Sequence, residues 1–320
     1  KVVNNKFTTF HVHGSEIAER VALRPFYYAQ VRVDPTNENR VYNVHGTIER
    51  SEDGGKIFYS LLRLERVHGD HHALWVSPDG KFLIDGNDGG VYLSRDRGAS
   101  WRFIENLPLG QFYHVNVDLA TPFNVMGGLQ DNNMWHGPSS VWSHGGIRFY
   151  DWKSIGAGDG MAVLADPDDP RYVYTTRESG RILRSDLETG ERQTIRPAHP
   201  GGIELRYSWN AGMAFDPHDG ALYIGSQFVH RSTDKGRTWT LISPDLTTND
   251  PEKQMADQSG GLTLDDSGAE NHTTILTIAP SPVERGVLWV GTDDGNVQLT
   301  RDGGLSWTNM VDRIEGVRPN

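Results

Sequence analysis

The stretch SRDRGASW (residues 94–101) recurs in the chain with the same residue types in the same register. The other copies are SEDGGKIF (51–58), STDKGRTW (232–239) and TRDGGLSW (300–307). An aspartate can accept hydrogen bonds from the backbone of its own turn, and a glycine tolerates positive φ. The motif therefore predicts a turn that closes on itself, and we expect a structural role for its aspartates, which are Asp53, Asp96, Asp234 and Asp302.

This turn closes a longer repeating unit. Six units begin at residues 28, 72, 113, 161, 212 and 275, so that successive starts are 41 to 63 residues apart. Each unit contains an alternating apolar run that ends at a turn, two further short runs separated by a glycine-bearing loop, and the aspartate turn, which together fit four short strands. A four-stranded propeller blade takes roughly 40 to 50 residues. In the third and fourth units the turn is replaced by DNNMWHGPSSVW (131–142) and RSDLETGE (184–191).

These repeats predict an all-β fold, a β-propeller of four-stranded antiparallel blades. Six repeats are visible, and a closed ring would have six or seven blades. We expect an N-terminal segment at 1–26, with a strand near 7–13 that could complete a blade, followed by the propeller at 27–320. The insertion at 243–272 lacks strand periodicity, and we expect it to form a lid or a partner-binding loop, or else a disordered decoration of the propeller.

Composition narrows the classes of function. The 320-residue chain has a formal net charge of -11, spread along the sequence without a lysine or arginine cluster, which argues against nucleic-acid binding. Its apolar runs fall short of the roughly 18 to 20 residues that cross a bilayer, so membrane insertion is not expected. The chain has no cysteine, which excludes disulfides and thiolate chemistry.

Candidate ligand-binding residues lie where each unit enters its first strand, because the innermost strands of a propeller line its central channel. Others lie in the loops that follow the second strands. Together these positions are Tyr28, His71, Tyr113, His114, Gln130, Asp131, Trp209, Asn210 and His272.

The densest candidate cluster is HGDHH (68–72). Side chains alternate along an extended segment, so His68, Asp70 and His72 are expected on one side and His71 on the other. The three could hold a divalent metal, form a proton-transfer pair in which Asp70 orients a histidine, or make a purely structural network. A carboxylate pair across the channel could also flank a glycosidic bond. The candidate catalytic residues are Asp70, His72, Asp159 and Glu270.

The pattern S/T-x-D-x-G-x-x-W resembles the Asp-box, or BNR repeat, of the sialidase, sortilin and xyloglucanase propellers. HGDHHALWV (68–76), GGLQDNN (127–133) and SPDLTTNDPEKQ (243–254) further resemble a family of exported bacterial proteins with glycosyl hydrolase-like or sortilin-like labels. The resemblance implies an extracytoplasmic location (periplasmic, cell-surface or secreted) and a chain that is part of a longer multi-blade protein. The chain has no counterpart of the sialidase arginine triad or the xyloglucanase catalytic aspartates, so no catalytic residue is carried over.

Two functions follow as expectations. The first is an extracytoplasmic propeller module that binds a glycan, a peptide or a protein partner, or that scaffolds a larger assembly. The alternative is a carbohydrate-active hydrolase or lyase that uses carboxylates and histidines of the channel mouth. The sequence leaves open whether the protein is an enzyme.

Overall fold

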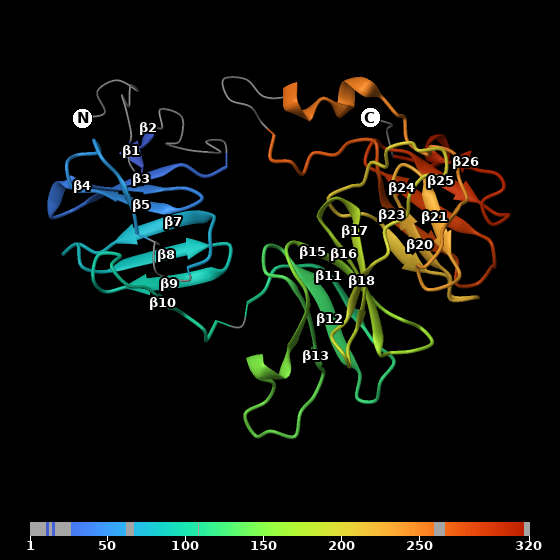
Figure 1. Cartoon of the computed structure of the whole chain (residues 1–320), viewed down its shortest axis with the longest axis horizontal. Coiled ribbons are helices and arrows are strands. Elements are labelled where there is room, and N and C mark those ends of the chain that lie inside the picture. Colours follow the sequence, from blue (N-terminus) through green and yellow to red (C-terminus); the bar gives the residue numbers. More distant parts are fainter. Residues whose placement is uncertain are drawn as a thin grey trace. The chain divides into compact units, whose positions relative to one another are not determined.

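The computed structural model describes residues 11–12, 15–16, 27–61, 67–107, 109–258 and 266–316. Within these ranges the chain forms six four-stranded antiparallel sheets (Figure 1). In every sheet the four strands lie in chain order, so each sheet is built from one sequence repeat. The fold is an all-β propeller with six blades, as the repeats predict.

The blades have the following strands. Blade 1 contains β3 (Gln30–Asp34), β4 (Asn37–Val44), β5 (Ile48–Ser51) and β6 (Tyr59–Ser60). Blade 2 contains β7 (His71–Val76), β8 (Leu83–Asn87), β9 (Gly90–Ser94) and β10 (Arg102–Phe103). Blade 3 contains β11 (Phe112–Val117), β12 (Asn124–Leu129), β13 (Met134–Pro138) and β14 (Lys153–Gly156). Blade 4 contains β15 (Gly160–Ala165), β16 (Tyr172–Arg177), β17 (Arg181–Asp186) and β18 (Arg192–Thr194). Blade 5 contains β19 (Met213–Phe215), β20 (Leu222–Gly225), β21 (Val229–Ser232) and β22 (Thr240–Leu241). Blade 6 contains β23 (Ile275–Pro280), β24 (Leu288–Thr292), β25 (Val297–Thr300) and β26 (Thr308–Asn309).

Helical structure among the described residues is limited to single 3-10 turns. They are η1 (Phe149–Asp151), η2 (Glu178–Gly180), η3 (Pro251–Gln254), η4 (Ala256–Gln258) and η5 (Val311–Arg313). In this part of the chain no helix has the length and hydropathy that crossing a bilayer requires.

The chain divides into two compact units, Lys1–Leu109 and Gly110–Asn320. The first unit contains blades 1 and 2, and the second contains blades 3 to 6. In the first unit β3 lies against β7, and in the second β11 lies against β15 and β19 against β23. These three pairs of neighbouring blades therefore meet through their first strands, as in a propeller.

Apolar side chains fill the space between neighbouring blades of each unit. In the first unit Tyr42 of blade 1 packs with Leu74 and Leu83 of blade 2. The second unit has three such layers, which are centred on Met126 and Val173 (blades 3 and 4), Tyr174 and Leu222 (blades 4 and 5), and Tyr223 and Leu288 (blades 5 and 6). Full burial of one such side chain contributes about 1.5–3 kcal/mol, so these layers hold the blades of a unit together.

The repeated turn closes on its aspartate. The Asp96 carboxylate accepts hydrogen bonds from the Ser94 hydroxyl at 2.9 Å, the Ser100 amide at 2.8 Å and the Ser100 hydroxyl at 2.6 Å. Asp234 and Asp302 accept the equivalent three bonds, and Asp53 accepts bonds from Ser51, Lys56 and Ile57. Hydrogen bonds from the hydroxyl and amide of Thr238 lower the pKa of Asp234 to about 2.

The glycine and the tryptophan of the turn dock it onto the preceding blade. Gly236 has φ +83°, and a Cβ there would lie 2.6 Å from Ile195 Cδ1, just beyond β18. Gly304 has φ +98°, and a Cβ there would lie 2.5 Å from the Ile242 carbonyl oxygen, just beyond β22. Trp239 Nε1 donates to the Ile195 carbonyl at 2.8 Å, and Trp307 Nε1 donates to the Ile242 carbonyl at 3.0 Å. In blades 5 and 6 the turn thus attaches its blade to the end of the outer strand of the preceding blade.

The described part of the insertion, residues 243–258 and 266–272, contains the turns η3 and η4 and no strand. It is attached to blade 6 through Thr248, whose amide and hydroxyl donate to Asp294 at 2.6 and 2.8 Å. A salt bridge of 3.0 Å joins Arg206 to Asp245 at its start. Its action as a lid or partner-binding loop stays a prediction.

In the N-terminal segment the structure describes β1 (His11–Val12) and β2 (Ser15–Glu16), which pair with each other. The remainder of 1–26, including residues 7–10 of the expected blade-completing strand, lies outside the described residues. That expectation, and the single domain expected at 27–320, stay predictions.

Candidate functional sites

Two segments of each blade meet at one end of its sheet. In an antiparallel sheet the start of the first strand lies beside the turn between the second and third strands. Blade 2 shows this arrangement, since the Asp88 amide after β8 donates to the Asp70 carbonyl before β7 at 3.3 Å. The two groups of candidate positions that the sequence offers therefore share one rim of the blade.

In the second unit this rim is organised around Asp159, at the entry to blade 4. Its carboxylate accepts the Asp131 amide of blade 3 at 2.6 Å and the Trp209 indole N–H, from the entry to blade 5, at 2.8 Å. Its own amide donates to Glu178 Oε1 at 2.8 Å. Asp159 is buried. The side chain thus ties three blades together at the rim.

A second contact joins residues far apart in the sequence. His114 Nε2, on β11 of blade 3, lies 3.0 Å from Asn210 Oδ1, at the entry to blade 5. Asn271 Nδ2, before blade 6, donates to Ser179 Oγ of blade 4 at 3.3 Å. Side chains from blades 3, 4 and 5 are therefore linked at this rim, and Asn271 of the insertion contacts blade 4. We call His114, Asp131, Asp159, Trp209 and Asn210 the rim network.

The rim network combines accessible polar groups with a fixed frame. His114 is exposed, and Trp209 and Asn210 are half-buried. Beside it, Gln111 Nε2 donates to Gln130 Oε1 at 2.7 Å, and Tyr113 is half-buried on β11. Amide, imidazole and indole groups offer hydrogen-bond donors and acceptors beside the carboxylates of Asp131 and Asp159, together with an aromatic surface.

Glu270 serves its own loop. Its carboxylate accepts the Ser267 amide at 2.9 Å, the Ser267 hydroxyl at 2.5 Å and the Ala269 amide at 3.0 Å. Burial raises the pKa of Glu270, but the hydrogen bonds from Ser267 outweigh it and leave the pKa below its ordinary value. Its neighbour His272 is exposed. A general acid needs a raised pKa, so this environment suits an ionised carboxylate.

The first unit has its own polar cluster at the equivalent rim. The Tyr28 hydroxyl donates to Asp70 Oδ1 at 2.8 Å, and His72 Nε2 lies 2.8 Å from Asp88 Oδ1. The carboxylate beside His72 is thus that of Asp88, whereas the sequence suggested that Asp70 would orient a histidine. The sequence offers Asp88 as a candidate position, because it follows the second strand of the same repeat, but it does not show that Asp88 would contact His72.

His71 and His68 lie apart from this cluster. His71 is buried, and its Nδ1 lies 2.8 Å from Asp85 Oδ2 inside the core of the first unit. His68 Nδ1 lies 3.2 Å from the Gly69 carbonyl. The described residues contain no group of three or more His, Cys, Asp or Glu side chains placed to hold a metal ion. The structure therefore does not gather His68, Asp70 and His72 into a ligand set.

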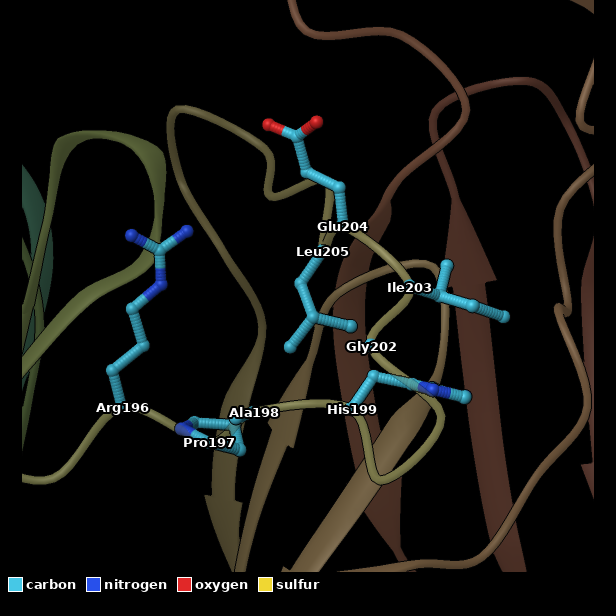
Figure 2. A pocket seen from close by; sticks show the side chains of 8 residues that line it. All are labelled: Arg196, Pro197, Ala198, His199, Gly202, Ile203, Glu204 and Leu205. Atoms are coloured by element: carbon cyan, nitrogen blue, oxygen red, sulfur yellow. The ribbon is translucent and has the colours of Figure 1, made fainter.

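A shallow hollow of about 350 Å³ lies in the loop between β18 and β19. Its lining residues all come from this one loop and are Arg196, Pro197, Ala198, His199, Gly202, Ile203, Glu204 and Leu205 (Figure 2). The Arg196 guanidinium lies 4.5 Å from the centroid of the Tyr207 ring. The sequence gives no sign of this hollow, since Arg-Pro and Gly-Gly indicate only a loop.

Comparison with known proteins finds sequence similarity over part of the chain. No family model matches the sequence. A xyloglucanase from Paenibacillus sp. is 28% identical over 197 residues, which are 54% of this chain and 18% of that protein. The chain therefore corresponds to a small part of that relative.

Two solved structures show how distant the structural likeness is. The GH74 xyloglucanase from Xanthomonas campestris is 16% identical, with 86% of this chain and 45% of that chain covered and a TM-score of 0.38. YCF48 bound to the D1 peptide is 14% identical, with 91% and 88% covered and a TM-score of 0.40. These TM-scores are too low for a function to be inferred from either structure.

Proposed function

We propose that the protein is a ligand-binding propeller module that binds a neutral glycan at the rim network of its second unit. The observation that carries this proposal is a hydrogen-bonded frame in which His114 of blade 3 contacts Asn210, while the adjacent Trp209 donates to the buried carboxylate of Asp159. Because these side chains are already fixed by hydrogen bonds to one another, a ligand would bind them with little further loss of conformational entropy.

The chemistry of the rim favours a neutral ligand rich in hydroxyl groups. Amide and imidazole groups exchange hydrogen bonds with hydroxyls, and the half-buried ring of Trp209 is of the type that packs against the C–H side of a sugar ring. The partial similarity to a xyloglucanase agrees with a glycan ligand. A peptide or protein partner is the competing ligand class, and scaffolding of a larger assembly is the outcome if no ligand binds.

The candidate catalytic residues support hydrolysis less than they support binding. The carboxylates of Asp159 and Glu270 each accept several hydrogen bonds from neighbouring groups, and the pKa of Glu270 is lowered. A glycosidase needs one carboxyl group that stays protonated at working pH. Under this proposal the two carboxylates position other groups, and binding does not lead to bond cleavage.

The Asp-box name and an extracytoplasmic location are parts of the same proposal. Both rest on the resemblance of the repeated S/T-x-D-x-G-x-x-W motif to exported propellers. Fractionation of the native source, with antibodies against the folded protein, would place the chain inside or outside the cytoplasmic compartment.

The test is binding of the purified protein to arrays of neutral oligosaccharides and, in parallel, of peptides. We expect selective retention of a neutral oligosaccharide and loss of that binding in Trp209→Ala and His114→Ala. The matched control is Trp142→Ala, which removes a fully exposed indole from the loop between β13 and β14. Binding to peptides alone, or glycan binding that all three variants keep, would contradict the proposal.

A further inference from the structure

The polar cluster of the first unit combines three aromatic rings with two carboxylates. The rings belong to Tyr27, Tyr28 and His72, and the carboxylates to Asp70 and Asp88. We propose that this ring cluster is a separate binding site for an organic ammonium group. The site does not depend on the proposed function, because all of its residues belong to blades 1 and 2 and the rim network belongs to the second unit.

The rings are close enough to act together on one cation. Their centroids are 5.3 Å apart for Tyr27 and Tyr28, 5.0 Å for Tyr27 and His72, and 5.5 Å for Tyr28 and His72. A charge seated about 4 Å above the centre of such a triangle lies about 5 Å from every centroid, within the roughly 6 Å reach of a cation–π interaction. A charge there interacts with the rings whose faces it lies over, and the Tyr27 ring, which is 51% exposed, is the most accessible of the three.

The planes of the rings differ, which suits a round ligand. The Tyr27 and His72 rings are at 90° to each other, the Tyr28 and His72 rings at 83°, and the two tyrosine rings at 57°. A flat ligand would stack on one of these planes only. A tetrahedral ammonium group carries its charge on several C–H or N–H faces, so it can meet rings in different orientations.

Two carboxylates, those of Asp70 and Asp88, border the cluster. Tyr28 donates to Asp70 at 2.8 Å, and His72 Nε2 lies 2.8 Å from Asp88. These contacts fix each carboxylate beside a ring of the cluster. A cation is attracted by both the ring faces and the carboxylates, whereas a neutral group of the same shape loses the charge–charge part of the interaction.

The cluster is both accessible and fixed in position. The Tyr27 side chain is 51% exposed, while Tyr28 is only 6% exposed. The backbone of Gly46 lies close behind, since a Cβ there would be 3.6 Å from the Tyr28 hydroxyl and 3.7 Å from Asp70 Oδ1. An exposed ring beside a buried, hydrogen-bonded one provides a site that is formed before the ligand arrives.

The test compares choline with its uncharged isostere 3,3-dimethyl-1-butanol by NMR titration of the intact chain. We expect saturable shifts of the Tyr27 and His72 ring resonances with choline, and binding of the isostere about tenfold weaker. Tyr27→Leu should weaken choline binding by about 3- to 30-fold, whereas Tyr27→Phe, which keeps the ring, should bind within about twofold of the wild type. Asp88→Asn should also weaken binding. Trp75→Leu, at another exposed aromatic residue of β7, is the matched control and should bind as the wild type does.

Two further probes identify the source of the ammonium group. A peptide with a trimethyl-lysine and the same peptide with an unmodified lysine separate a methylated protein partner from a primary amine, and choline alone represents a small metabolite. Saturable binding of any one of the three, with the expected response to Tyr27→Leu, supports the proposal. Absence of saturation by all three, equal affinity for the isostere, or an unchanged affinity in a folded Tyr27→Leu protein would overturn it.

Discussion

The two adjacent glycines of the last repeated turn give a direct test of why the turn recurs. Gly303 has φ +72° and no atom within 4 Å of the position of a Cβ. Gly304 has φ +98°. A Cβ at Gly304 would lie 2.5 Å from the carbonyl oxygen of Ile242 and 3.0 Å from the Cβ of Ile242. An alanine in the left-handed region costs about 1–2 kcal/mol at either position. Overpacking against the neighbouring strand end adds about 1–3 kcal/mol at Gly304 alone.

We therefore expect Gly303→Ala to destabilise the second unit by about 1–2 kcal/mol and Gly304→Ala by about 2–5 kcal/mol. For a unit of this size each kcal/mol lowers the Tm by about 2–4 °C, so Gly304→Ala should melt at least about 2 °C below Gly303→Ala. The assay is differential scanning calorimetry of both variants and the wild type, with urea unfolding as a second measure. If the two variants lose the same stability, or Gly303→Ala loses more, the turn does not dock on the preceding blade as described.

Three further predictions concern groups whose environment the fold determines. Trp239→Phe removes the hydrogen bond from Nε1 to the Ile195 carbonyl, and we expect it to lower the free energy of unfolding in urea by about 1–3 kcal/mol. An unchanged urea midpoint would mean that this bond does not hold blade 5 to blade 4. The pKa of Asp234 is held at about 2, below its model-compound value of 3.8, so its ionised form stabilises the folded state above about pH 4, and this contribution is lost as the pH falls toward 2. The stability difference between the wild type and Asp234→Asn should accordingly shrink over that range, and a difference that stays constant from pH 5 to 2 would contradict the assignment. Burial lowers the pKa of His230 from 6.5 to about 4, so the neutral ring stabilises the folded state above about pH 6.5, and up to about 3 kcal/mol is lost as the pH falls to 4. An NMR titration in which the His230 ring titrates at or above 6.5 would refute this.

The blades could be predicted because their information is local and repeated. The spacing of the units, the alternating runs and the aspartate turn each depend on residues within one blade. The first strands accordingly begin at Gln30, His71, Phe112, Gly160, Met213 and Ile275, within a few residues of the starts expected from the sequence. The division of the chain after Leu109 has no such signal, because the repeats continue across it with the same spacing.

The contacts of the candidate sites could be predicted only in part. Position at the entry to a first strand identified His114, Asp159 and Trp209, yet it could not show that the indole of Trp209 would donate to Asp159, since that distance depends on how two blades pack. The same limit explains His72, whose partner is Asp88 from the neighbouring turn. The alternation of side chains along β7 could not reveal this contact, because alternation describes one strand at a time.

Loops were the least predictable part of the sequence. Glu270 looked like a carboxylate available to the channel, but the fold of its loop brings the Ser267 amide and hydroxyl onto it. The hollow lined by Arg196 and Leu205 has no motif at all. Such features depend on backbone turns that residue types only weakly determine.

The measurement that most directly tests the central claim is isothermal titration calorimetry of the array-selected oligosaccharide against the wild type, Trp209→Ala and Trp142→Ala. The account predicts saturable binding to the wild type and to Trp142→Ala, and a loss of at least about tenfold in affinity for Trp209→Ala. Equal affinity in all three proteins, or binding abolished by Trp142→Ala instead, would contradict a ligand site at the rim network.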